Sequence, residues 1–261
     1  MDLGIKGKLA LVTAASKGIG RATAAGLLAE GARVMICARN AEELDITKGE
    51  LMSDEGEINS FIADVSDPEQ LRELYAHTIE KYGPIDILIN NAGGPPPGSH
   101  QDLDDEAWLN AFNLTVQSAI RLTNLVLPSM KTAGWGRIVN ISSYSVRQPM
   151  DNMMLSNSLR LSVLGWAKTL ANEVAPRGIL VNTVCPGWTN THRVSSLLQS
   201  RSVAEGITID EARETIAQNV PLGRLAEADE IANMVVFLSS NAASYVTGVA
   251  VPVDGGISRV V

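Results

Sequence analysis

Short runs of apolar and β-branched residues recur along the chain, separated by longer stretches in which apolar positions follow helical spacing. Strands that alternate with helices are joined by crossover connections, which produce a parallel sheet covered by helices on both faces. The pattern therefore predicts an α/β fold: one doubly wound domain with a mostly parallel seven-stranded sheet. The predicted strands are Leu9–Thr13, Arg33–Cys37, Glu57–Ile62, Ile85–Asn90, Arg137–Ile141, Leu180–Val184 and Val249–Val253.

One segment, from about 189 to 221, breaks this rhythm and is rich in Ser, Glu, Gln and Arg. Ligands of open α/β sheets bind at the carboxyl edge of the strands, and functional loops gather there. We therefore expect this segment to be a lid-like insertion over that edge. The chain has no Pro/Gly/Ser linker, internal repeat or charge block, so residues 1–261 are predicted to form a single domain.

Composition excludes several classes of protein. The 261 residues are 45% hydrophobic and 19% charged, which is too apolar for a disordered chain and unlike collagen. A net charge of −8 argues against nucleic acid as a partner. No apolar run is long enough to cross a membrane, and no basic, apolar leader opens the chain, so a cytoplasmic location without membrane contact is expected.

The metal and disulfide chemistry open to the chain is limited. Cys37 and Cys185 lie far apart without paired spacing, so both are predicted to be small core residues. The three histidines, His77, His100 and His192, have no ligand spacing, and no metal site is predicted.

The first predicted strand runs into a glycine-containing turn, Thr13 to Gly20, and then into a helix. Glycines at such a junction let the backbone approach a pyrophosphate, whose charge the helix N-terminus stabilises. A tight turn with no ligand is the alternative. Two further strand ends carry candidate contacts: Asp64 and Val65 for an adenine ring, and the small residues of Asn91-Ala92-Gly93 beside a ribose. A turn or helix-cap role for Asp64 is the alternative there.

These segments resemble the short-chain dehydrogenase/reductase family. Its Thr-Gly-x-x-x-Gly-x-Gly turn is matched with Ala14 in place of the first glycine, which we expect to be tolerated with a negative φ. The resemblance continues, in order, through Asp64-Val65, Asn90–Gly93, Asn113, Ile141–Ser143, Pro186-Gly187 and Val253–Gly256, and Asn91–Pro96 is similar to a divergent β-ketoacyl-carrier-protein reductase-like subgroup. It implies a Rossmann domain, an oxidoreductase acting on a carbonyl/alcohol pair, and a homotetramer or dimer.

The choice of dinucleotide depends on the end of the second strand. An acid there binds the ribose hydroxyls of NAD, whereas a cation accommodates the phosphate of NADP. The chain has Arg39 and no carboxylate at that site, and Lys17 is close enough in the glycine turn to join it. NADP(H) is therefore predicted in preference to NAD(H). The alternative is that both cations are solvated surface charges.

The resemblance implies a catalytic Asn and Ser, matched by Asn113 and Ser143, and a Tyr-x-x-x-Lys pair on one helix. Thirteen residues after Ser143 stands Ser156, and four further on stands Arg160, so both the Tyr and the Lys are absent. A serine hydroxyl is a far weaker acid than a phenol, and a guanidinium stays charged and cannot shuttle protons. The ordinary family mechanism therefore cannot operate unchanged.

Three functions remain open. The first is an NADP(H)-linked reductase or dehydrogenase, 3-oxoacyl reductase-like, protonated by Tyr144, by a water between Ser143 and Ser156, or by the substrate. The second is a lyase or isomerase with Arg160 as an anion clamp, and the third is a dinucleotide-binding regulatory module. We expect Tyr144 to point to the face opposite Ser143 and to be structural.

A partly apolar small-molecule substrate is expected beside Pro149, Met150, Met153, Met154 and Trp188, and Arg147 or His192 could meet an anionic group on it. Packing of the helix or an interface is the alternative role for the apolar residues. The predicted catalytic residues are Asn113, Ser143, Ser156 and Arg160. The predicted cofactor contacts are Thr13, Ser16, Lys17, Gly18, Ile19, Gly20, Arg39, Asp64, Val65, Asn91, Ala92, Gly93, Arg160, Pro186, Gly187, Thr189 and Thr191.

Overall fold

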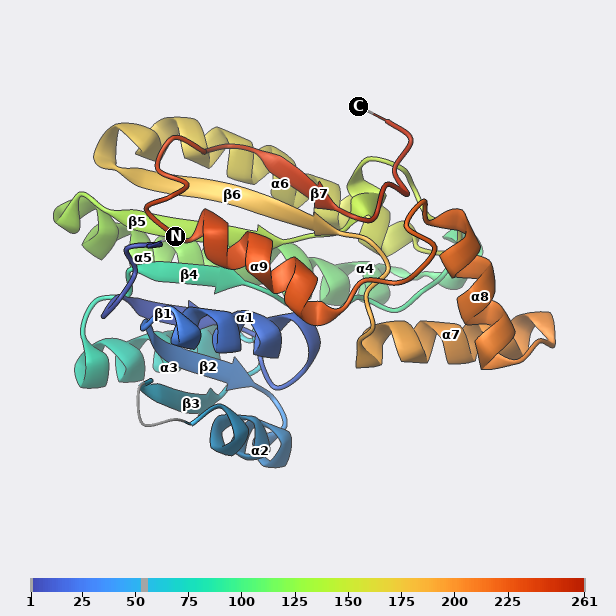
Figure 1. Ribbon diagram of the computed structural model, residues 1–261, viewed down its shortest axis with the longest axis horizontal. Helices are drawn as coiled ribbons and strands as arrows, with labels where there is room; N and C mark the ends of the chain where they lie inside the picture. Colours follow the sequence, from blue (N-terminus) through green and yellow to red (C-terminus); the bar gives the residue numbers. More distant parts are fainter. Residues whose placement is uncertain (1, 53–55, 261) are drawn as a thin grey trace.

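The computed structural model describes residues 2–52 and 56–260, and its centre is a twisted seven-stranded sheet (Figure 1). The strand order is β3-β2-β1-β4-β5-β6-β7 and every pairing is parallel, which confirms the predicted α/β architecture. Each strand begins and ends within two residues of the predicted run. The strands are β1 Leu9–Val12, β2 Arg33–Ala38, β3 Ile58–Ile62, β4 Ile87–Asn90, β5 Gly136–Ile141, β6 Ile179–Pro186 and β7 Ala250–Val253.

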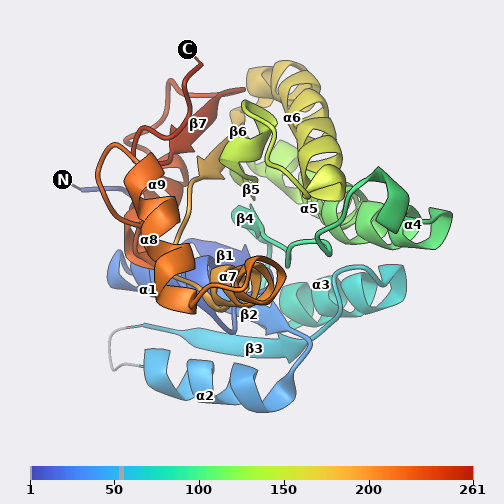
Figure 2. The same ribbon diagram turned by 90° about the vertical axis from the view of Figure 1, so that its right-hand side faces the viewer.

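Helices cover both faces of the sheet (Figure 2). One apolar core joins the sheet to α1, α2 and α9, and a second joins its other face to α3, α5 and α6. Because β1, β4 and β6 are buried on both faces, they consist mostly of apolar residues and not of an alternating pattern. The helices are α1 Gly18–Ala29, α2 Ala41–Leu51, α3 Pro68–Tyr82, α4 Asp105–Phe112, α5 Ser118–Ala133, α6 Met154–Val174, α7 His192–Glu205, α8 Ile209–Asn219 and α9 Ala228–Leu238.

Local sequence signals explain where several helices begin. The Asn40 side chain accepts a hydrogen bond from the Glu43 amide at the start of α2. Asp67 caps α3 in the same way and is followed by Pro68, whose missing N–H costs nothing in the first turn. These caps fix the exit of the chain from β2 and β3, the two strand ends that carry Arg39 and Asp64.

The strand order reverses between β1 and β4, because the chain moves outward to β2 and β3 and then returns across the sheet. Loops leaving the carboxyl ends of β1 and β4 therefore diverge to opposite faces, and a crevice opens between them. All the predicted cofactor contacts except Arg160, which lies in α6, follow carboxyl ends of strands, so the topology brings them to this edge of the sheet.

The segment predicted to be a lid contains α7 and α8, which form a helical hairpin projecting beyond the same edge (Figure 1). The hairpin has its own apolar cluster, formed by Val194, Leu198, Ala212, Ile216 and Leu225. It is therefore a compact unit seated on the crevice, although its function as a lid remains a prediction.

No helix within residues 2–52 and 56–260 combines the length and the apolar character needed to span a bilayer.

The packing of α1 against the turn that follows β1 leaves no room for a side chain at Gly20. A Cβ at this position would lie 2.6 Å from the Ala14 carbonyl oxygen and 2.9 Å from the Ala15 Cα, both backbone atoms that cannot move aside. We expect Gly20→Ala to lower the free energy of unfolding by about 1–3 kcal/mol in chemical denaturation.

The matched control is Gly49→Ala. Gly49 lies in exposed α2, and a Cβ there would meet nothing within 4 Å. This variant should be neutral or gain up to about 1 kcal/mol of stability from helix propensity. Equal stability of the two variants would show that the β1 turn is not packed as described.

Candidate active site

The crevice is held open at its base by hydrogen bonds between the ends of β1 and β4. The Thr13 hydroxyl donates to the Asn91 carbonyl oxygen at 2.6 Å and accepts from the Asn91 amide at 2.9 Å. The Asn91 side-chain amide donates to the Ala14 carbonyl oxygen at 3.1 Å. Thr13 and Asn91 thus join the glycine turn to the neighbouring loop, which fixes the distance between the two walls of the crevice.

The turn after β1 adopts left-handed conformations at Gly18, with φ +54°, and at Ala14, with φ +47°. The expectation of a negative φ at Ala14 is wrong. The turn needs this conformation to aim the Ala14 carbonyl at Asn91, and the Cβ of an alanine makes it costly by roughly 1–2 kcal/mol.

Two connected cavities of about 600 and 590 Å³ follow the carboxyl edge of the sheet. They share the lining residues Ala14, Lys17, Arg39, Glu43, Gly93 and Gly94, so they form one continuous groove. The outer half also contains Ser16, Asp64 and Val65. The inner half, here called the cleft, contains Ser143, Ser156 and Arg160.

Most of the predicted cofactor contacts lie along this groove. The cleft is lined by Lys17, Gly18, Ile19, Arg39, Asn91, Ala92, Gly93, Arg160, Pro186, Gly187, Thr189 and Thr191. Thr13 and Gly20 line neither half of the groove and instead support the turn from beneath. Thr191 also caps α7, where its hydroxyl accepts from the Val194 amide at 3.4 Å.

Both cations predicted to select NADP(H) have carboxylate neighbours. Lys17 Nζ lies 2.5 Å from Glu43 Oε1, and Arg39 Nη1 lies 3.5 Å from Asp64 Oδ2. The end of β2 has no carboxylate, as the sequence analysis states, but α2 and the end of β3 place Glu43 and Asp64 beside the two cations. The Arg39 side chain is 74% exposed, so its pair with Asp64 is weak and available for exchange with a phosphate.

Asp64 is also a turn residue. Its Oδ1 accepts hydrogen bonds from the Ser66 amide at 2.9 Å and the Ser66 hydroxyl at 2.7 Å. The turn role considered for Asp64 is therefore present, and the side chain still lines the outer half of the groove.

Ser143 and Ser156 both line the cleft, as the sequence alignment with the family pattern requires. The Ser143 hydroxyl accepts from the Ser145 amide at 3.1 Å, which caps a short 3₁₀ turn, Tyr144–Val146. Ser156 is buried in the first turns of α6. Two hydroxyl groups therefore stand where the family pattern has a serine and a tyrosine.

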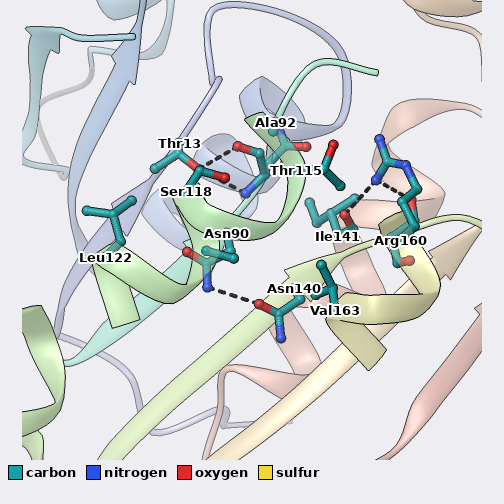
Figure 3. A pocket seen from close by; sticks show the side chains of 13 residues that line it. Thr13, Asn90, Ala92, Thr115, Ser118, Leu122, Asn140, Ile141, Arg160 and Val163 are labelled. Carbon is teal, nitrogen blue, oxygen red and sulfur yellow. Dashed lines mark hydrogen bonds between the residues drawn. The ribbon is translucent and has the colours of Figure 1, made fainter. Parts of the chain in front are cut away.

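Arg160, one turn further along α6, lines the cleft and also a small neighbouring cavity, which Figure 3 shows. Its Nη1 donates to the carbonyl oxygens of Ile141 and Ser142, each at 3.0 Å. Burial, and secondarily repulsion from Arg193, lowers the pKa of the guanidinium to about 10. Arg160 is still charged at neutral pH, and no carboxylate among the described residues forms an ion pair with it.

Tyr144 is buried, as a structural role predicts, and it also lines the cleft. The strand ends at Ile141 and the chain enters the 3₁₀ turn, so the alternation no longer applies, and Tyr144 lines the same cleft as Ser143. Burial raises the pKa of its phenol to about 12. Tyr144 is thus a phenol within the cleft, protonated throughout the neutral range.

The structure does not bring Asn113 to the cleft. Its side-chain oxygen accepts from Arg121 Nη2 at 3.3 Å, and Asn113 is not among the residues that line the cleft. Residues Asn113–Gln117 form a π-helical turn between α4 and α5, which shifts the following side chains around the helix axis. Thr115, which the sequence analysis did not single out, lines a small cavity with Arg160 instead.

The apolar wall is also only partly as predicted. Met150, Met153 and Trp188 line the cleft, whereas Pro149 and Met154 do not. His192 lines the cleft, but Arg147 donates to the Ala250 carbonyl oxygen at 3.1 Å and is not among the lining residues.

Cys37 and Cys185 are buried and free, as expected of core residues. Among the described residues, no three His, Cys, Asp or Glu side chains are grouped to hold a metal.

The doubly wound sheet and the glycine turn at its switch point define a dinucleotide-binding type of α/β protein. Comparison with known proteins makes this more specific. Residues 13–258 match the family model described as enoyl-(acyl carrier protein) reductase. The 3-oxoacyl-(acyl-carrier-protein) reductase FabG of Pseudomonas aeruginosa is 36% identical over 257 residues, covering 98% of this chain and 99% of that protein.

Solved structures give the same result. The L-sorbose reductase of Gluconobacter frateurii, complexed with NADPH and L-sorbose, superposes with a TM-score of 0.95 at 32% identity over 100% of both chains. An actinorhodin polyketide ketoreductase with NADPH gives 0.94 at 37% identity, covering 97% of this chain and 98% of the other. The chain therefore belongs to the short-chain dehydrogenase/reductase family.

The left-handed Ala14 leads to a stability prediction. Ala14→Gly should remove the Cβ strain, partly offset by the greater freedom of glycine in the unfolded chain, for a net gain of up to about 1 kcal/mol. Denaturant unfolding measures it. Ala15→Gly is the control, because Ala15 is buried with an ordinary φ and should lose stability. A loss at both positions would contradict the strain at Ala14.

Proposed function

We propose that the protein is an NADP(H)-dependent oxidoreductase that acts on a carbonyl/alcohol pair in the cleft, similar to the 3-oxoacyl reductases. The observation that carries the proposal is the continuous groove, which begins at Asp64 and Val65, crosses the glycine turn and ends at Ser143 and Ser156. Relatives whose structures contain NADPH support the choice of cofactor.

The residues along the groove fit this cofactor. Gly18 and Ile19 at the start of α1 line the groove, so the free backbone amides of this helix N-terminus suit a pyrophosphate there. Lys17 and Arg39 suit the additional phosphate of NADP(H), which would compete with Glu43 and Asp64 for them. The preference for NADP(H) over NAD(H) therefore depends on how readily these two ion pairs exchange.

The bound cofactor supplies a hydride to a carbonyl carbon, and the chain must hold the carbonyl and deliver a proton to its oxygen. Ser143 and Ser156 can donate hydrogen bonds to that oxygen. Arg160 stays charged at neutral pH and cannot release a proton. We assign the proton to Tyr144, the phenol of the cleft, which an alkoxide can deprotonate because an alkoxide is the stronger base.

Titration of NADPH and NADH by fluorescence, followed by turnover of ketones, β-ketoacyl thioesters and alcohols, tests the function. We expect saturable binding of NADPH, tighter than that of NADH, and oxidation of NADPH by a carbonyl compound. Binding without any turnover would indicate a regulatory module or chemistry without hydride transfer. Absence of binding would overturn the proposal.

The pKa of Tyr144 predicts an unusual pH profile. A phenol with a pKa of about 12 is protonated below that value, so the reduction rate should not fall between pH 6 and pH 9. Tyr144→Phe should lower kcat by about 10²-fold or more, which steady-state assays across this range would measure. Full activity in Tyr144→Phe would assign the proton to water or to the substrate.

The altered pair on α6 leads to a second variant. Ser156→Tyr combined with Arg160→Lys restores the acid and the ammonium that the family pattern has at these positions. If the cleft places hydride and carbonyl in the usual arrangement, kcat for carbonyl reduction should rise by about 10²-fold. An unchanged or lower kcat, with NADPH binding retained, would show that the cleft is arranged for other chemistry.

Assembly and location complete the proposal. Exposed Leu109 of α4 and Leu161 of α6 support a packing surface for further copies, and we propose a homotetramer in the cytoplasm. Size-exclusion chromatography with light scattering tests the number of subunits.

A further inference from the structure

The cleft has an excess of positive charge that the groove for the cofactor does not account for. Its charged lining consists of Lys17, Arg39, Arg160 and Arg193, against one carboxylate, Glu43. Glu43 is paired with Lys17 near the glycine turn. The two arginines at the catalytic end, Arg160 and Arg193, form no ion pair with any described carboxylate.

These two arginines come from elements on opposite sides of the cleft. Arg160 is on α6, whereas Arg193 is in the first turn of α7 and donates from Nη2 to the Pro95 carbonyl oxygen at 2.6 Å. Arg193 packs so closely on the Pro95 loop that a Cβ at Gly94 would lie 2.6 Å from its Nε. Repulsion from Arg193 contributes to the lowered pKa of Arg160, so the fold holds the two guanidinium groups within range of each other's charge.

Arg160 has hydrogen-bonding capacity left over. Both carbonyl oxygens that it contacts are bound by Nη1, and its Nε and Nη2 have no protein acceptor among the described residues. Nε–H and Nη2–H form the edge of a guanidinium that binds a carboxylate with two parallel hydrogen bonds. Arg160 is only partly buried, so this edge is free to exchange water for an anion in the cleft.

Two hydroxyl groups without hydrogen-bond partners lie beside Arg160, at the small cavity next to the cleft. The buried side-chain oxygens of Thr115 and Ser142 have no hydrogen-bond partner, and both line, with Arg160, a cavity of about 20 Å³ next to the cleft. Figure 3 shows Thr115, Ile141 and Arg160 beside one another at this cavity. Buried polar atoms without partners are uncommon and mark a place where a ligand or a water completes the site.

We propose that Arg160 and Arg193 bind a carboxylate of the substrate, so that the substrate is a short oxo acid and not a neutral ketone. This inference rests on the proposed function for the reaction and adds the substrate class. Ser156 lies one helical turn before Arg160, a separation of about 5–6 Å between Cβ atoms, which suits a carboxylate one or two carbons from the reacting carbonyl. The hydroxyl groups of Thr115 and Ser142 complete the hydrogen bonds around this end of the cleft.

The test uses two probes that differ in charge and are not reduced: oxamate, a carboxylate next to a carbonyl, and its neutral methyl ester. Each is titrated into the protein saturated with NADPH, and binding is followed by the fluorescence of the cofactor. The protein should bind oxamate at least about tenfold more tightly than the ester, because charge-assisted bidentate hydrogen bonds require the carboxylate.

Variants of the two arginines assign this preference to its residues. Arg160→Gln and Arg193→Gln should each reduce the preference for oxamate to about twofold or less, and Arg160→Lys should retain part of it. Arg177→Gln, which removes the same charge from an exposed position in the 3₁₀ turn Ala175–Arg177 that follows α6, should leave the ratio unchanged. Both probes are titrated into the same NADPH-saturated variant, so the ratio of their dissociation constants is not changed by a loss of NADPH affinity.

The outcomes separate the two proposals. Failure of NADPH to bind would overturn the proposed function before either probe is added. If NADPH binds and the two probes bind equally, or if the preference survives in both glutamine variants, the carboxylate site is overturned and the reductase function stands.

Discussion

The site depends on the tie between Thr13 and Asn91 across the switch point of the sheet. Parallel strands whose order reverses leave a gap between their loops, and packing alone would not fix its width. The reciprocal hydrogen bonds of Thr13 with Asn91 fix it, and the Asn91 side chain extends the tie to Ala14. The close approach of Gly20 beneath this tie explains why the helix can begin immediately under the turn.

The hydrogen bonds of Thr13 and Asn91 do not determine which side chains line the inner end of the cleft. The glycine turn and the ends of β4 and β6 line the groove predicted for a dinucleotide, whereas α6 places Ser156 and Arg160 in the cleft. An arginine at this position brings a fixed charge and a planar donor edge where an ammonium would tune the pKa of a neighbouring phenol. An arginine at this position is therefore better suited to binding an anion than to assisting proton transfer.

The sequence was sufficient to predict the strands, the doubly wound order and most of the groove, because these follow from apolar runs and from residues placed directly after strands. It was insufficient wherever a side chain's direction depends on irregular backbone. Asn113 lies in a π-helical turn and binds Arg121, while Thr115 of the same turn lines a cavity with Arg160. Tyr144 lies in a 3₁₀ turn after β5, where the alternation of a strand does not apply, and it lines the cleft. The strained φ of Ala14 likewise follows from its bond to Asn91 and not from its own preference.

The sequence also did not reveal which partners the charged side chains of the groove contact. Glu43 and Asp64 reach Lys17 and Arg39 from different elements, and Arg193 reaches the Pro95 loop from α7. None of these pairs is close in sequence, so each needs the fold to be known. The lack of an ion pair at Arg160 also could not be predicted, because it depends on every residue that packs near this side chain in the fold.

The most direct test of this account is a crystal structure of the protein grown with NADPH. The account predicts the pyrophosphate over the start of α1 and the nicotinamide ring at the catalytic end of the cleft, beside Ser143 and Ser156, with the donor edge of Arg160 open toward the substrate. A crevice filled by side chains, or a cofactor bound elsewhere on the sheet, would contradict it.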